Sequence, residues 1–90
     1  MNIGFLGLGK LGLPVSLAVE DKGHNIFGYD ISTQTLEDIR NKHIRYKEEW
    51  VEKFLPNTKL KINNIDDLVK NSEIIFVPIQ TPHDPKYEGV

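Results

Sequence analysis

The 90-residue sequence contains no cysteine. This absence excludes disulfides, thiolate metal sites and cysteine nucleophiles from these residues. The histidines, His24, His43 and His83, show no metal-ligand spacing, so no metal site is expected. A chain without cysteine and without an export signal is typical of the cytoplasm, which is the location that the sequence predicts.

A long, unbroken hydrophobic run is also missing. The most apolar segment, from Met1 to Val19, is interrupted by several glycines and by Pro14, and its first basic residue is Lys10. A signal peptide carries its positive charge first and an uninterrupted apolar stretch next, and a membrane helix needs about 20 apolar residues. The segment fits neither pattern, so we expect no membrane partner.

Charge of one sign is not concentrated anywhere in the sequence. The chain has 11 basic and 13 acidic side chains, a net charge of −2, and its lysines and arginines are interspersed with acids. Proteins that bind nucleic acids carry a clustered basic surface, so no nucleic-acid partner is expected. Hydrophobic residues at 39% and charged residues at 27% are ordinary for a soluble globular domain, and the length allows one domain at most.

The apolar pattern predicts strands that alternate with helices. Strands are expected at residues 2–7, 26–29, 59–63 and 74–79. Helices are expected from Leu11 to Lys22, from Ser32 or Thr33 to about Lys42, at residues 46–55 and at residues 65–70. Such alternation is typical of an α/β fold with a doubly wound parallel sheet, here with about four strands.

Within the predicted helices, periodicity indicates which side chains face the core. For the first helix the shared apolar face comprises Leu11, Val15, Ala18 and Val19. For the second helix the inward residues are Leu36, Ile39 and His43. For the third, a core-facing stripe is favoured over an aromatic stacking platform at Tyr46, Trp50 and Phe54. Its acids are expected on a solvated face rather than in an acid/base pair: Glu48, Glu49 and Glu52.

A glycine motif, Gly7-Leu8-Gly9-Lys10-Leu11-Gly12, leaves the first predicted strand and opens the first predicted helix. In such a motif Gly7 permits the tight turn, Gly9 lets the backbone approach a pyrophosphate, and Gly12 lets the helix lie close to the strand. The phosphates would meet free N–H groups and the positive end of the helix dipole. The motif and its context therefore predict a Rossmann-type dinucleotide site.

Asp30 ends the second predicted strand. A carboxylate there can accept hydrogen bonds from both ribose hydroxyls of the adenosine half, and it repels a 2′-phosphate. The first arginine after it is Arg40, so the sequence favours NAD over NADP. The alternative interpretation is that the glycines form a structural turn and Asp30 is a surface acid. Thr81, just past the last predicted strand, is interpreted as a cofactor contact or as part of a simple turn.

Several segments together resemble the UDP-glucose/GDP-mannose dehydrogenase family: residues 7–15, 23–24, 28–31 and 80–82. The Leu-Pro after the third glycine and the Thr-Pro after the last strand are the more discriminating parts. The resemblance implies two Rossmann-type domains joined by a long helix, which oxidise a nucleotide-sugar alcohol twice, to the carboxylate, with two NAD. Residues 1–90 would be the N-terminal part of the NAD-binding domain, without the substrate domain and the central helix.

The resemblance also implies roles for particular residues. The cofactor contacts would be Gly7, Gly9, Lys10, Leu11 and Gly12 at the phosphates, Asp30 and Ile31 at the adenosine ribose, and Thr81 at the fourth strand. The family often has a basic residue where this chain has Thr35. The family's nucleophilic cysteine, lysine and aspartate lie far downstream, so no catalytic residue is expected here. The full-length protein would contact its nucleotide sugar through the missing regions, form a homodimer and serve polysaccharide biosynthesis.

Two alternatives stay open on the sequence alone. The 3-hydroxyacid/6-phosphogluconate dehydrogenases also begin with a strand, Gly-Leu-Gly-x-x-Gly and a proline. They more typically show methionine beside the third glycine and a different loop at residues 80–82. The second alternative is a dinucleotide-binding or regulatory module with no catalysis of its own, because the chain offers no constellation of acid, base and nucleophile.

Overall fold

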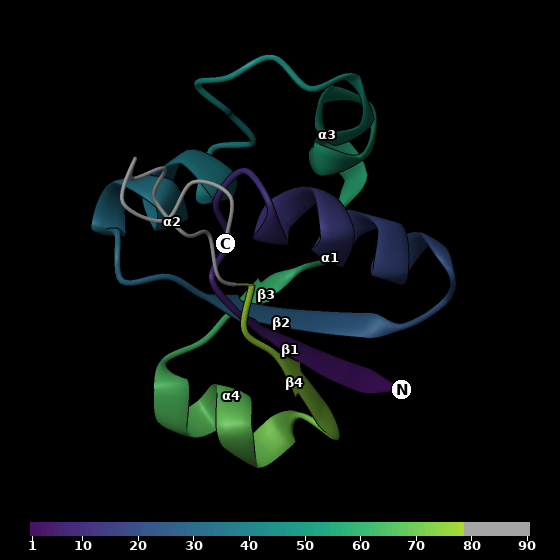
Figure 1. Ribbon diagram of the computed structural model, residues 1–90, viewed down its shortest axis with the longest axis vertical. Coiled ribbons are helices and arrows are strands. Elements are labelled where there is room, and N and C mark those ends of the chain that lie inside the picture. Colours follow the sequence, from purple (N-terminus) through teal and green to yellow (C-terminus); the bar gives the residue numbers. More distant parts are fainter. Residues whose placement is uncertain (79–90) are drawn as a thin grey trace, which may run out of the picture.

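The computed structural model describes residues 1–78, which form a four-stranded sheet in the order β3-β2-β1-β4. The elements are β1 (Asn2–Leu6), α1 (Gly12–Asp21), β2 (Asn25–Tyr29), α2 (Thr33–Arg40), α3 (Glu49–Phe54), the 3₁₀ turn η1 (Leu55–Asn57), β3 (Lys61–Ile62), α4 (Ile65–Asn71) and β4 (Ile74–Phe76). All pairs are parallel. Figure 1 shows α1, α2 and α3 on one face of the sheet and α4 on the other. The predicted doubly wound α/β fold is confirmed.

Local signals in the sequence begin and end several of these helices. Ser32 caps α2, because its hydroxyl oxygen accepts the Thr35 N–H at 3.2 Å, and Asn64 caps α4 by accepting the Asp67 N–H at 2.8 Å. Gly23 follows the last turn of α1 with a φ of 99°, which suits glycine. The predicted starts of α2 and α4 and the predicted end of α1 before Gly23 are therefore confirmed.

The buried face of α1 differs from the predicted one. Leu13, Ser16 and Leu17 are buried, whereas Leu11 and Val15 are 48% and 39% exposed. The tight return from β1 into α1 turns residues 13, 16 and 17 toward the sheet. Ser16 is tolerated there because its hydroxyl donates to the Leu13 carbonyl at 2.7 Å, so a polar residue conceals the inward face in the sequence pattern.

The region after α2 also differs from expectation. Helix α3 begins only at Glu49, because the Glu48 carboxylate accepts the Trp50 N–H at 3.2 Å and caps it. Tyr46 therefore lies outside the helix, and His43 is exposed rather than inward. The predicted aromatic stripe is reduced to Trp50 and Phe54, which pack on each other and cover the core from its edge. Their helix inserts other side chains into the core, namely those of Val51 and Leu55.

The main core lies between the sheet and the helices α1, α2 and α3. Its buried residues include Ile3, Phe5 and Ile26 from the strands and Leu36 and Ile39, as predicted, from α2. On the other face, Leu68 of α4 is fully buried against the sheet. Among residues 1–78, none of the helices is both long enough and apolar enough to cross a membrane.

Candidate functional site

The glycine loop between β1 and α1 makes a sharp turn that is tied to β2. Gly7 has a φ of 127°, a conformation that side chains disfavour, and its N–H donates to the Tyr29 carbonyl at 2.8 Å. A Cβ at Gly12 would collide with the carbonyl oxygen of Gly7. The absence of side chains at both positions therefore lets the helix start directly against the end of the strand.

Gly9 differs from these two glycines, because a Cβ added there would meet no atom of residues 1–78 within 4 Å. It lines an open cleft of about 170 Å³ with Gly7, Leu11, Gly12, Asp30 and Pro78. No side chain caps the first turn of α1. The Leu13 N–H donates to the Gly9 carbonyl at 3.0 Å and Pro14 has no N–H, but within residues 1–78 the N–H groups of Leu11 and Gly12 beside the cleft have no acceptor. They can donate to an anion at the positive end of the helix dipole.

Asp30 is held against this loop by backbone donors. Its Oδ2 accepts the Leu8 N–H at 2.8 Å, and its Oδ1 accepts the Ser32 N–H at 2.8 Å. The structure thus brings the predicted acid and the glycine loop into one cleft. Because each carboxylate oxygen offers about two lone pairs, each retains a free acceptor position beside the cleft.

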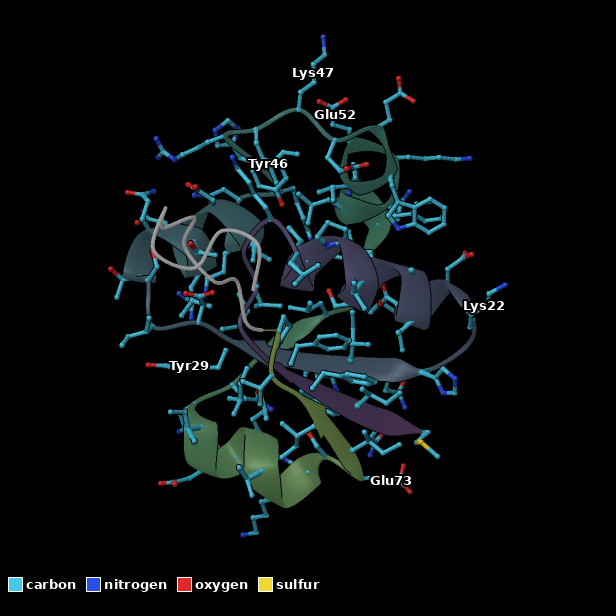
Figure 2. The ribbon with its side chains drawn as sticks, in the orientation of Figure 1. Lys22, Tyr29, Tyr46, Lys47, Glu52 and Glu73 are labelled. Atoms are coloured by element: carbon cyan, nitrogen blue, oxygen red, sulfur yellow. The ribbon has the colours of Figure 1, made fainter. Side chains whose placement is uncertain are left out.

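An apolar hollow of about 260 Å³ adjoins Asp30 on its other side. Ile31, which is 91% exposed, and Ile65, the first residue of α4, line it with Leu6 and Tyr29. Figure 2 shows Tyr29 extending outward from the carboxyl end of β2. Sequence reasoning named Ile31 but missed Ile65. The sequence did offer a signal: Ile65 is an isoleucine at the first position of α4, a helix whose buried residue is Leu68.

A second hollow, of about 200 Å³, lies on the other side of Gly9, beneath the segment between α2 and α3. Lys10 lines it, with Nζ 5.8 Å from the centre of the Tyr46 ring. Tyr46, labelled in Figure 2, has a buried hydroxyl with no hydrogen-bond partner within residues 1–78. Burial, with the nearby Glu48 carboxylate, raises the pKa of Tyr46. Sequence reasoning missed Tyr46 here because its spacing had placed it on a helix.

An ion pair on the rim of this hollow connects α2 to the segment that follows it. The Arg45 Nε lies 2.8 Å from the Asp38 Oδ2. The hydrogen bond from Arg45 is the largest cause that holds the pKa of Asp38 below its usual value. Thr35, where the family often has a basic residue, lines the same hollow.

The remaining predictions about the site concern Thr81 and metal binding. Thr81 lies outside the described residues. Within residues 1–78 no three His, Asp or Glu side chains lie together in a way that could hold a metal ion. The glycine loop, Asp30 and Ile31 therefore form the candidate site, with Lys10 pointing to the Tyr46 side of it.

This arrangement matches a known family along almost the whole chain. Residues 1–89 match the UDP-glucose/GDP-mannose dehydrogenase family, NAD binding domain. The chain belongs to this family. The match to the NAD-binding domain of this family favours the main interpretation over the 3-hydroxyacid/6-phosphogluconate alternative.

Relatives of known name support the same assignment. The chain is 31% identical to protein CapL of Staphylococcus aureus over 83 residues, which cover 92% of this chain and 19% of CapL. It is 29% identical over 86 residues to the UDP-N-acetyl-D-mannosamine dehydrogenase of Pyrococcus horikoshii, covering 91% of this chain and 21% of that protein. The chain thus spans about a fifth of the length of these relatives.

Solved structures share the fold. The UDP-N-acetyl-D-mannosamine dehydrogenase structure from P. horikoshii superposes with a TM-score of 0.74 at 28% identity, over 93% of this chain and 21% of that one. The GDP-mannose dehydrogenase structure from Pseudomonas aeruginosa superposes with a TM-score of 0.78 over 96% of this chain and 21% of that one. At 21% identity the latter comparison shows the fold alone.

Proposed function

We propose that the cleft between the glycine loop and Asp30 is where this domain binds NAD, with the diphosphate against the first turn of α1. The observation that carries the proposal is the space at Gly9. A Cβ there would meet no atom of residues 1–78 within 4 Å, so the glycine leaves room for a ligand. The N–H groups of Leu11 and Gly12, which have no acceptor within residues 1–78, border that room and are suited to phosphate oxygens.

The adenosine half would lie toward Asp30. Its carboxylate is oriented by the N–H groups of Leu8 and Ser32, and it keeps acceptor positions for the two ribose hydroxyls. The negative charge would repel a 2′-phosphate, which favours NAD over NADP. The proposed contacts are Gly7, Gly9, Lys10, Leu11, Gly12, Asp30, Ile31 and Thr81.

The hollow beside Ile31 and Ile65 suits the apolar faces of an adenine ring, because exposed branched side chains line it. Lys10 would add a positive charge next to the diphosphate from the Tyr46 side. NAD supplies the hydride acceptor when it is bound. The residues of this chain hold and orient that cofactor.

For the whole protein we propose a 6-dehydrogenase that oxidises a nucleotide-sugar alcohol to the carboxylate. The name of the P. horikoshii relative, a UDP-N-acetyl-D-mannosamine dehydrogenase, supports this class of substrate. Catalysis by a thiolate would fall to residues outside this chain, which has no cysteine. Cytoplasmic location, a homodimeric full-length protein and a role in polysaccharide biosynthesis belong to the same proposal.

Replacement of Gly9 tests the diphosphate assignment. Gly9→Val should abolish NAD binding measured by calorimetry, while the free energy of unfolding changes by less than about 1 kcal/mol, because the added atoms enter open space. Val15→Ala, an exposed change on α1, is the control and should leave both quantities close to the wild-type values. Unchanged NAD affinity in Gly9→Val would remove the assignment.

A further inference from the structure

A fourth glycine, Gly28, is the last residue but one of β2 and lies beneath Leu8 of the glycine loop. It pairs with Phe5 of β1 in the sheet register. A Cβ added at Gly28 would lie 2.6 Å from Cδ1, 3.0 Å from Cδ2 and 3.2 Å from Cγ of Leu8. The Leu8 side chain of the glycine loop therefore occupies the space that any other residue at position 28 would need.

Leu8 is also fixed from its backbone. Its side chain is 1% exposed, and its N–H donates to Asp30 Oδ2 at 2.8 Å. The neighbouring Gly7 N–H donates to the Tyr29 carbonyl at 2.8 Å. Consecutive residues at the end of β2 thus hold the loop in different ways. Gly28 offers space, Tyr29 a carbonyl and Asp30 a carboxylate.

We propose that Gly28 is a positioning residue of the diphosphate site. By lacking a side chain it lets Leu8 sit deep on β2, and this depth sets where Gly9 and the first N–H groups of α1 stand. Gly28 itself touches no cofactor in this scheme. The inference rests on the proposed NAD function and adds a residue that the glycine triad does not contain.

A side chain at position 28 could be accommodated in two ways. Rotation of the end of Leu8 moves Cδ1 and Cδ2, but Cγ at 3.2 Å must also give by a few tenths of an ångström. Either the loop backbone lifts away from β2, or the whole Leu8 side chain swings into the neighbouring hollow of about 200 Å³ that it lines. Lifting displaces the diphosphate site, whereas swinging leaves it in place. The proposal requires the first.

The chain offers a matched control in Gly4. This glycine lies on β1, and a Cβ there would collide with the Ser72 hydroxyl oxygen and come within 2.7 Å of Cδ2 and 3.1 Å of Cγ of Leu68, a buried leucine of α4. The crowding is similar, but it falls on the face of the sheet opposite the glycine loop. Gly4→Ala therefore reproduces the packing damage without touching the site.

The experiment measures NAD affinity by calorimetry on folded protein, with the fluorescence of Trp50 as the check of folding. Gly28→Ala should raise the Kd for NAD at least about tenfold, because small displacements of positioning groups are costly. Gly4→Ala should lower stability and leave the Kd unchanged. Adding Leu8→Ala to Gly28→Ala removes the crowding, so the Kd of the double variant should lie within about threefold of that of Leu8→Ala alone.

A second measurement keeps the test independent of NAD. Amide hydrogen exchange of Leu8 should accelerate in Gly28→Ala and not in Gly4→Ala, because lifting the loop weakens the bond to Asp30. Wild-type affinity with slow Leu8 exchange in Gly28→Ala would mean that Leu8 swings into the hollow, and it would overturn the proposal. If Gly28→Ala does not fold, a folded double variant that binds NAD more weakly than Leu8→Ala alone would also overturn the proposal. Failure of the wild type to bind NAD would refute the proposed function instead, and the exchange comparison would still decide the role of Gly28.

Discussion

The β1–β2 half of the sheet and the β4 edge differ in how completely side chains cover them. Phe5 and Ile26 are 0% and 2% exposed, whereas Ile74, Ile75 and Phe76 on β4 are 44%, 36% and 45% exposed. Parallel strands are ordinarily covered on both faces. β4 meets that condition on neither face, although it carries the most strand-like stretch of the late sequence.

The candidate site is built on the well-covered half. The glycine loop is bonded to β2 and packed over Gly28, whereas among residues 1–78 the β4 side adds Pro78 alone to the cleft. A binding loop needs a rigid support, since loose positioning costs affinity. The contrast indicates that the diphosphate cleft is largely independent of the exposed edge.

The strongest test of this contrast compares the two phenylalanines that stack on each other, Phe5 and Phe76, with ring centres 5.4 Å apart. Phe5→Ala should lower the free energy of unfolding by about 3–5 kcal/mol, because it opens a cavity in the core. Phe76→Ala should cost about 1–2 kcal/mol, since nearly half of that side chain is already in water. Denaturant titration of both variants makes the measurement, and equal losses would contradict the contrast.

A second test compares two glycines of the same loop. Gly12→Ala should lower the free energy of unfolding by about 2–3 kcal/mol, because its methyl group meets the Gly7 carbonyl. Gly9→Ala should change stability by less than about 0.5 kcal/mol, since it adds a methyl group to open space. Thermal unfolding measures both, and a large loss in Gly9→Ala would show that the cleft is not open.

Asp30→Ala sharpens the assignment of the cleft itself. The variant should bind NAD about tenfold more weakly, and its preference for NAD over NADP should narrow, because the ribose acceptor and the repulsive charge are both lost. Asp21→Ala removes the same charge from the exposed end of α1 and serves as the control. Calorimetry with both cofactors makes the comparison. An undiminished preference would clear Asp30 of the ribose role.

The smallest expected effect concerns the exposed pair of Asp38 and Arg45. Arg45 lowers the folded-state pKa of Asp38, so the pair's contribution to stability is full above the unfolded value and is lost as pH falls through the lowered pKa. In Arg45→Ala the Asp38 pKa should rise toward 3.8, which an NMR titration of the carboxyl group would follow. An unchanged Asp38 pKa would show that the pair does not form in solution.

Much of the fold could be predicted from the sequence because its signals are local. Glycine and proline positions, the caps at Ser32 and Gly23, and the apolar strands specified the order of elements and placed Asp30 at the end of β2. The inward face of α1 could not be predicted, because it depends on how the loop returns the helix to the sheet. Nor could the position of Tyr46, since the segment between α2 and α3 has no period to follow.

The sequence by itself determined the kind of site: glycines that leave backbone donors bare, and an acid on the next strand to receive a ribose. Only the tertiary structure decided that Asp30 bonds to Leu8, that Leu8 lies over Gly28, and that Gly9 faces open space while Gly12 does not. The physical reason is how far apart the contacting residues lie along the chain. Turns and caps depend on neighbours in the chain, whereas these contacts join residues that the parallel pairing of β1 and β2 brings side by side.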